Sequence, residues 1–220
     1  MALSGRICDN GRWLEVRSCA CGRGVASNNE NILVLASSSP RRRELLARAG
    51  VKFEVVPPPV EEPSEVGRSS APMRQALALA YFKARAVWEL HPTRWVLGAD
   101  TIVAVKDKIL GKPADADHAR SMLGELSSFK HAVITGVALL GPDGRRSINA
   151  AVTYVTMRKM SPEEIEQYIV LGEWIGKAGA YAIQESADRF VERLEGSFTN
   201  VVGMPMELVM KMLLAAGVAG

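Results

Sequence analysis

Three consecutive arginines, residues 41–43, stand where a helix is expected to begin. Residues 32–36 form an apolar run typical of a strand buried on both faces, and a Ser-Ser-Ser-Pro segment follows at once. Ser39 is a good N-cap, Pro40 suits the first helical position, and Gly50 is a natural stop. The helix macrodipole is already positive at this end, so an anion should balance the arginines. Hydroxyls, free N–H groups and guanidiniums in one place indicate a phosphate site, with a solvated basic turn as the alternative.

Three further charged residues interrupt patterns that are otherwise apolar or tightly turned. Asp100 lies within an apolar extended segment over residues 95–105, so it must meet a cation or hydrogen-bond donors, or lie where the strand opens to a cleft. Lys83 projects along the apolar stripe of a helix expected over residues 72–90. It either snorkels from the edge of that stripe or points at a ligand between helix and sheet. Lys112 is held between a glycine and a proline, which fix its backbone.

Two segments contain residues that could bind a metal, glutamates in one and cysteines in the other, but neither segment shows the periodicity of a helix or strand. A stiff, proline-rich loop over residues 57–63 presents two adjacent glutamates, and acidic loops are usually just solvated. All three cysteines, Cys8, Cys19 and Cys21, lie near the start of the chain. A structural zinc site usually has four Cys or His ligands in paired spacings, and the nearest histidine is His91. We therefore interpret residues 1–30 as a poorly ordered extension with reduced cysteines.

The composition describes an ordinary globular protein. The chain has 220 residues, enough for a core that needs no disulfide or metal. A net charge of +3 is too close to balance for a bulk nucleic-acid or membrane-surface binder. No apolar run approaches the roughly 18 residues of a spanning helix, and charges within the first 20 residues argue against a signal peptide. We expect a cytoplasmic protein without a nucleic-acid or membrane partner.

The remaining elements alternate between strand and helix. Helices are expected over residues 116–126, 161–170 and 205–216, the second starting in a Ser-Pro-Glu-Glu capping box. Strands are expected over residues 133–140 and 147–157, joined by a Gly-Pro-Asp-Gly turn, and in two short stretches on either side of Gly196. His118 and His131 stand alone and are interpreted as structural or solvated. This alternation, with one clear hairpin, predicts an α/β fold with a mixed sheet.

Taken together, the motifs resemble one family, the Maf-like nucleoside triphosphate pyrophosphatases. The resemblance runs from Ile32 to about Leu213, so residues 31–220 are expected to form the pyrophosphatase domain. Six motifs follow one another in the order of the family: Leu-Ala-Ser-Ser-Ser-Pro-Arg-Arg at 35–42, Val-Glu-Glu at 60–62, Lys-Ala at 83–84, Gly-Ala-Asp-Thr at 98–101, Gly-Lys-Pro at 111–113, and Lys-Ala-Gly-Ala-Tyr at 177–181 continuing to Gln184. Each motif alone is weak, but six in order are specific.

The resemblance implies a fold, a reaction and a set of site residues. The fold would be a mixed, largely extended central sheet flanked by helices, with a cleft between two lobes, as in Maf and ITPase-like proteins. The reaction would be hydrolysis of a nucleoside triphosphate between the α and β phosphates, with Mg²⁺ or Mn²⁺. The implied substrate-binding residues are Ser37, Arg42, Lys83 and Lys112, and Glu62 and Asp100 are implied as metal ligands. Asp100 is also similar in position to the general base of the family; because a metal-bound carboxylate is a poor base, the sequence leaves open whether Asp100 is base, metal ligand or both.

The resemblance also implies a base preference. Arg41, Thr101 and Gln184 match the branch of the family that favours dTTP and UTP, so we expect pyrimidine triphosphates, including modified ones, as substrates. The sequence departs from the usual pattern at Ser128, Trp174, Gly176 and Glu185, where the family commonly has Gly, Pro, Asp and Gly. These departures bear on base preference more than on phosphate chemistry.

Three other functions remain open at this point. Another branch of the family hydrolyses 7-methyl-GTP. Family members are also associated with inhibition of septum formation, so the chain could arrest cell division as a nucleotide-sensing protein that acts by binding. A nucleotide-sugar transferase would use the same phosphate contacts, but no acceptor site is discernible. The complete set of Glu62, Lys83, Asp100 and Lys112 favours an enzyme, because a pure binder would not need it. A homodimer is the assembly left open.

Overall fold

The computed structural model describes residues 32–59, 71–106 and 108–218 of the chain. The strands are β1 Leu33–Ala36, β2 Phe53–Val55, β3 Val96–Val105, β4 Lys108–Leu110, β5 Lys130–Leu140, β6 Arg146–Met157 and β7 Val191–Glu195. The helices are α1 Pro40–Arg48, α2 Pro72–Trp88, α3 Ala116–Leu126, α4 Pro162–Leu171, α5 Phe198–Val202 and α6 Met206–Ala216, with short 3-10 helices η1 Pro142–Gly144, η2 Ala178–Ala180 and η3 Ser186–Phe190.

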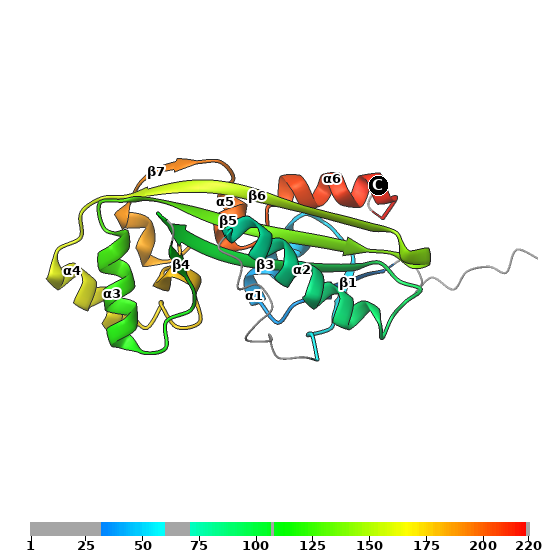
Figure 1. The fold of residues 1–220 in the computed structure, drawn as a ribbon, viewed down its shortest axis with the longest axis horizontal. Helices are drawn as coiled ribbons and strands as arrows, with labels where there is room; N and C mark the ends of the chain where they lie inside the picture. The colour runs from blue at the N-terminus through cyan, green and yellow to red at the C-terminus, as the bar shows by residue number, and fades with distance from the viewer. Residues whose placement is uncertain (1–31, 60–70, 107, 219–220) are drawn as a thin grey trace, which may run out of the picture.

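One mixed sheet of seven strands runs through the molecule (Figure 1). Its order is β2-β1-β3-β5-β6-β7, with β4 paired to β3. β1 pairs in parallel with β2 and β3, and the other neighbours are antiparallel. The long strands β5 and β6 extend from one end of the molecule to the other (Figure 1). The mixed α/β sheet predicted from the sequence is therefore confirmed.

Strand β1 is buried on both faces, as its unbroken apolar run predicts. Leu33 and Leu35 belong to one apolar cluster, and Val34 and Ala36 belong to a second. Successive side chains of a strand point to opposite faces, so the two clusters lie on opposite sides of the sheet. Burial on both faces fixes the end of β1, and with it the start of α1.

Helix α2 lies directly on the sheet because two glycines leave room for it. A side-chain carbon added to Gly98 would come within 2.7 Å of the Ala80 carbonyl oxygen, and one added to Gly136 within 2.2 Å of the Ala76 carbonyl oxygen. Both distances are far below van der Waals contact, so only glycine permits this approach. The close packing sets Lys83 of α2 beside strand β3.

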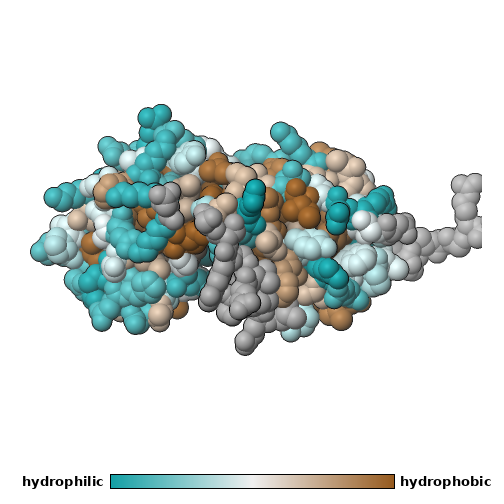
Figure 2. Space-filling view, viewed as in Figure 1, coloured by the Kyte–Doolittle hydropathy of each residue, from teal (hydrophilic) through white to brown (hydrophobic). Residues whose placement is uncertain are grey.

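The helices gather at two ends of the sheet. Helices α3 and α4 pack together at one end, where Arg120 of α3 is paired with Glu166 of α4, while α1, α2 and α6 lie toward the other (Figure 1). Hydrophilic side chains cover most of the surface over α3 and α4 in Figure 2, as expected where the apolar faces of both helices point inward. No helix in the three described stretches is both long and apolar enough to cross a membrane.

One predicted element is wrong. The stretch after Gly196 was expected to be a strand, whereas residues Phe198–Val202 form helix α5. Ser197 caps this helix by accepting a hydrogen bond from the Asn200 backbone N–H, and the Asn200 side chain is buried and bonded to the Val133 carbonyl oxygen. These contacts with distant strands override the strand propensity of the local sequence. The stretch before Gly196 is β7, as predicted.

Candidate active site

A cavity of about 810 Å³ opens where the β1–α1 turn, α2, β3 and the segment around η2 meet. Among the described residues, five cationic side chains line it, Arg41, Arg42, Lys83, Lys112 and Lys177, together with two carboxylates, Asp100 and Glu185. This described part of the lining carries a clear excess of positive charge. An opening of this size and sign suits an anionic ligand of several phosphate groups.

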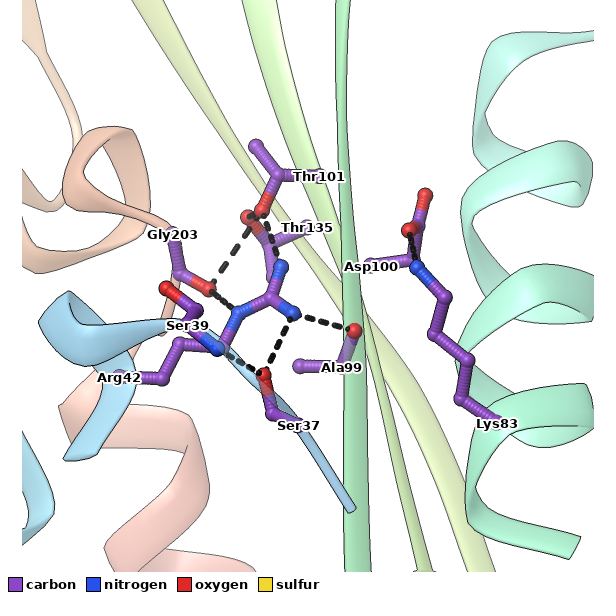
Figure 3. Close-up of polar contacts among 9 residues, drawn as sticks. All are labelled: Ser37, Ser39, Arg42, Lys83, Ala99, Asp100, Thr101, Thr135 and Gly203. Carbon is purple, nitrogen blue, oxygen red and sulfur yellow. Dashed lines mark hydrogen bonds and ion pairs between the residues drawn. The ribbon is translucent and has the colours of Figure 1, made fainter. Parts of the chain in front are cut away.

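Arg42 lies at the centre of the first group of contacts, which we call the Arg42 cluster (Figure 3). To other described residues its guanidinium donates four hydrogen bonds: Nε to Gly203 O at 2.8 Å, Nη1 to Ala99 O at 2.7 Å and to Ser37 Oγ at 3.4 Å, and Nη2 to Thr101 Oγ1 at 3.1 Å. These partners come from the end of β1, from β3 and from the residue after α5. The guanidinium thus fixes the start of α1 against the sheet and brings a positive charge to the cavity.

The hydroxyls of the Arg42 cluster are also engaged. Ser37, only 5% exposed, accepts a hydrogen bond from the Ser39 backbone N–H at 3.2 Å. Thr101 shares a hydrogen bond of 2.9 Å with Thr135 on the neighbouring strand. Ser39 occupies the predicted N-cap position of α1, but its side chain makes no capping hydrogen bond. The first-turn N–H groups of α1 therefore rely on another acceptor, which an anion in the cavity would supply.

Asp100 and Lys83 form a second contact on the opposite side of β3 (Figure 3). Lys83 Nζ lies 2.5 Å from Asp100 Oδ1, and the side chains are only 16% and 12% exposed. Asp100 follows Ala99 and precedes Thr101, so alternation along the strand turns it away from Arg42 and toward α2. Of the alternatives stated for Asp100, the structure shows a cation partner, and the residue also lines the cavity. Its other carboxylate oxygen has no hydrogen-bond partner among the described residues.

Three more charged residues of the cavity form what we call the Glu185 cluster: Arg41, Lys177 and Glu185. Lys177 Nζ lies 3.7 Å from Glu185 Oε1. Burial lowers the pKa of the Arg41 guanidinium, and attraction to Glu185 works against that shift. Tyr181 also lines the cavity, and burial raises the pKa of its hydroxyl. This hydroxyl lies 2.9 Å from His131 Nε2, which ties the segment around η2 to strand β5.

The structure brings most of the predicted site residues together. Ser37, Arg41, Arg42, Lys83, Asp100, Thr101 and Lys112 all line the one cavity. Gln184 is exposed and is not among the described residues that line the cavity. Its neighbour Glu185 does line the cavity. Glu62 lies outside the described residues, as do the three cysteines and residues 1–30.

Sequence reasoning did not select Lys177, Glu185 and Gly203 as site residues. Two of these residues could have been found from the sequence, because Lys177 is the first residue of the sixth motif and Glu185 is a departure from the family pattern. Gly203 could not have been found in this way, because it contributes only its backbone carbonyl oxygen, which accepts a hydrogen bond from Arg42 161 positions away in the sequence. Of the other departures, Gly176 lines the cavity, while the Trp174 indole N–H donates to the Ile169 carbonyl oxygen.

Residues 32–216 match the family model described as Maf-like protein. The chain is 44% identical over 174 residues to the dTTP/UTP pyrophosphatase of a Geobacillus species, covering 79% of this chain and 92% of that protein. It is 45% identical over 189 residues to the dTTP/UTP pyrophosphatase of Citrifermentans bemidjiense, covering 86% and 97%.

Among solved structures, the Staphylococcus aureus Ham1 protein is similar with a TM-score of 0.46 and 12% identity, covering 84% of this chain and 98% of that chain. The family model spans nearly all of the described chain, and the two pyrophosphatases are well above 30% identical over most of it. The family match over residues 32–216 and the two relatives at 44% and 45% identity show that the chain belongs to the Maf-like protein family.

Proposed function

We propose that this protein hydrolyses nucleoside triphosphates, dTTP and UTP first among them, between the α and β phosphates. The products are a nucleoside monophosphate and pyrophosphate. The observation that carries the proposal is the cavity itself, where five cationic side chains and the start of α1 surround a buried carboxylate. The names of the relatives, dTTP/UTP pyrophosphatases at 44–45% identity, support the same substrates.

Phosphate binding follows from the charges in the cavity. A triphosphate carries about four negative charges, which Lys83, Lys112 and the Arg42 cluster can balance together with the N–H groups at the start of α1. Ser37 and Arg42 are held by their mutual contacts, so they face the ligand without further ordering. Groups fixed in advance stabilise the charge that develops on departing pyrophosphate, because no reorganisation is needed during the reaction.

Asp100 is the proposed general base. A water molecule attacks the α phosphorus, a new oxygen–phosphorus bond forms, and the bond from the α phosphorus to the bridging oxygen breaks. Asp100 takes the proton that the water loses, and pyrophosphate leaves with the bonding electron pair. The contact with Lys83 at 2.5 Å holds the carboxylate in one orientation for this transfer.

A divalent cation fits the residues of the site. Asp100 offers a hard oxygen ligand in the cavity, with one carboxylate oxygen free of other partners among the described residues. Within residues 32–59, 71–106 and 108–218, no group of three His, Cys, Asp or Glu could hold a metal alone, so phosphate oxygens and Glu62 would complete the ligand set. A bound Mg²⁺ or Mn²⁺ would polarise the phosphoryl oxygens.

The biological role proposed here is removal of modified pyrimidine nucleotides in the cytoplasm, with an effect on cell division as a further consequence. Arg41, Thr101 and Gln184 are the proposed specificity residues. Arg41 is in position to contact a base, whereas Thr101 accepts a hydrogen bond from Arg42 and would act through it. The expected partner is a nucleoside triphosphate rather than nucleic acid or a membrane. A homodimer is the proposed assembly.

The test is pyrophosphate release from dTTP, UTP, CTP, GTP and 7-methyl-GTP, with Mg²⁺ or Mn²⁺ and with EDTA. We expect metal-dependent release, fastest for dTTP and UTP. The Asp100→Asn variant should lose at least roughly 100-fold in kcat while it still binds nucleotide, since only the proton acceptor is removed. Comparable turnover of 7-methyl-GTP would overturn the pyrimidine preference. Binding without turnover in the wild type would support the nucleotide-sensing alternative.

A further inference from the structure

The Glu185 cluster places one carboxylate beside two cationic side chains in the wall of the cavity. Lys177 Nζ lies 3.7 Å from Glu185 Oε1, and Arg41 is close enough for the charge of Glu185 to influence its pKa. All three residues line the same cavity as Asp100 and Lys83. A nucleotide whose phosphates lie on the cations near Asp100 has this cluster available for its base.

The backbone around Glu185 is held in place. Its N–H donates to the Ala182 carbonyl oxygen at 3.1 Å, and its own carbonyl oxygen accepts from the Asp188 N–H at 3.3 Å. The next residue, Ser186, donates from its backbone N–H at 2.9 Å and from its hydroxyl at 2.7 Å to the Glu173 carboxylate. The backbone from which the Glu185 side chain projects is therefore fixed by hydrogen bonds.

The contact between Lys177 and Glu185 is not that of a structural ion pair. Their separation of 3.7 Å exceeds the usual length of a hydrogen bond, and the two side chains remain 20% and 37% exposed. Such a pair stabilises a fold little. Among the described residues, the Glu185 carboxylate and the Arg41 guanidinium make no side-chain hydrogen bond, so both retain bonding capacity toward the cavity.

The cavity wall beside the cluster carries no side chain at residue 176. Gly176, next to Lys177, also lines the cavity, and a side-chain carbon added there would meet nothing within 4 Å. The position thus leaves open volume where any other residue would project.

The edge of a uracil or thymine ring offers an acceptor at O2, a donor at N3–H and an acceptor at O4. Its complement is a donor, an acceptor and a donor, which the two cations and the carboxylate provide. We propose that Glu185 is a specificity-determining residue that accepts a hydrogen bond from the N3–H of the base, while Arg41 and Lys177 donate to its two carbonyl oxygens. This inference rests on the proposed function and names the group that reads the base.

The same arrangement rejects cytosine. Cytosine has no hydrogen on N3, so its lone pair would face the Glu185 carboxylate, and its amino group would face a cation. Each of these contacts would then join groups of the same kind, an acceptor with an acceptor and a donor with a donor, which discriminates between bases more strongly than a difference in size. Glu185 would thus add to the specificity residues that the resemblance assigns, and it lines the cavity directly after Gln184 in the sequence.

The test compares two size-matched variants on UTP, dTTP, CTP and N3-methyl-UTP, which lacks the N3–H. Glu185→Leu removes the acceptor, and Glu185→Gln keeps a carbonyl oxygen. We expect Glu185→Leu to lower kcat/KM for UTP and dTTP by roughly 10- to 100-fold, the usual effect of one charge-assisted hydrogen bond. Glu185→Gln should retain most of the activity. Glu192→Ala, an exposed carboxylate on β7 outside the cavity, is the control and should leave every substrate unchanged.

The decisive comparison is N3-methyl-UTP. Glu185→Leu should not lower its kcat/KM, because N3 carries a methyl group in place of the hydrogen that Glu185 would accept. Equal losses for UTP and N3-methyl-UTP, or retention of UTP activity by Glu185→Leu, would overturn the inference while leaving the proposed function intact. No release of pyrophosphate from UTP or dTTP by the wild type would overturn both. If Glu185→Leu does not fold, the Glu185→Gln variant and the wild-type preference for UTP over CTP decide.

Discussion

The three adjacent arginines at the start of α1 lie in different environments. Arg41 lies in the Glu185 cluster, Arg42 is bonded to backbone carbonyls and hydroxyls, and Arg43 is exposed. Arg42 satisfies the carbonyl oxygens of Ala99 and Gly203, which belong to strand β3 and to the turn after α5. Two factors therefore explain why basic residues stand at the positive end of this helix. Carbonyl oxygens of the protein accept hydrogen bonds from Arg42, and the cavity is suited to bind an anion.

Replacing Arg42 by lysine should lower the free energy of unfolding by about 1–3 kcal/mol. A single ammonium cannot reach in the four directions that the guanidinium reaches, so partly buried carbonyl oxygens lose their donors. Urea denaturation of the wild type and of Arg42→Lys measures the difference. The matched control is Arg43→Lys on the same turn, which is exposed and should change the free energy by less than about 0.5 kcal/mol. Equal effects of the two variants would contradict this role for Arg42.

At the scale of elements, the sequence predicted those helices and strands whose signals are local. The capping box begins α4, where Ser161 accepts from the Glu164 N–H and Glu164 reaches back to the Ser161 N–H, and Gly172 ends the helix in the left-handed region. Helix α5 was missed because Asn200 is stabilised by distant strands. The Glu185 cluster could not be predicted for the same reason, since only the tertiary fold brings residue 41 to residue 185.

The packing of α2 on the sheet gives a prediction for glycine. Gly136→Ala would put a methyl group within 2.2 Å of the Ala76 carbonyl oxygen, a backbone atom that cannot move without the helix. We expect a loss of about 2–3 kcal/mol in the free energy of unfolding and a lower kcat, because α2 carries Lys83 to its contact with Asp100. Thermal unfolding and pyrophosphate release measure the two effects.

The control for that variant is Gly124→Ala. Gly124 lies inside helix α3, where an added side-chain carbon would meet nothing within 4 Å. Alanine is the better helix former, so this variant should gain about 0.5–1 kcal/mol and keep full activity. Equal changes in the free energy of unfolding for the two alanine variants would contradict the explanation that the close approach of α2 requires glycine at position 136.

At the scale of the whole molecule, the cavity depends on contacts between parts that lie far apart in the chain. The turn after β1 supplies Ser37 and Arg42, whereas the segment around η2 supplies Lys177 and Glu185. The second segment is attached to strand β5 through Tyr181, whose hydroxyl lies 2.9 Å from His131 Nε2, with the two rings packed edge to face. His131 is only 1% exposed, so this attachment belongs to the core of the fold.

That buried histidine should make folding stability depend on pH. Burial lowers the pKa of His131 from 6.5 to about 4, so the folded protein holds this ring neutral while the unfolded chain protonates it near pH 6.5. Between these values the unfolded state binds more protons, and stability therefore falls as the pH is lowered. The contribution is complete above about pH 6.5, and its loss between pH 7 and pH 5 should be about 2 kcal/mol.

The measurement is the free energy of urea unfolding at pH 7 and pH 5 for the wild type, His131→Gln and His118→Gln. The wild type should lose about 2 kcal/mol more than His131→Gln over this interval, because the variant has no ring to protonate. His118 is exposed, so its replacement should leave the wild-type dependence unchanged. Carboxylates such as Glu164, whose pKa is lowered to about 2 by Arg158, contribute equally to all three proteins and cancel in the comparison. Identical pH dependence in the wild type and His131→Gln would show that the ring titrates in the folded state as it does in the unfolded chain, so that burial does not keep it neutral.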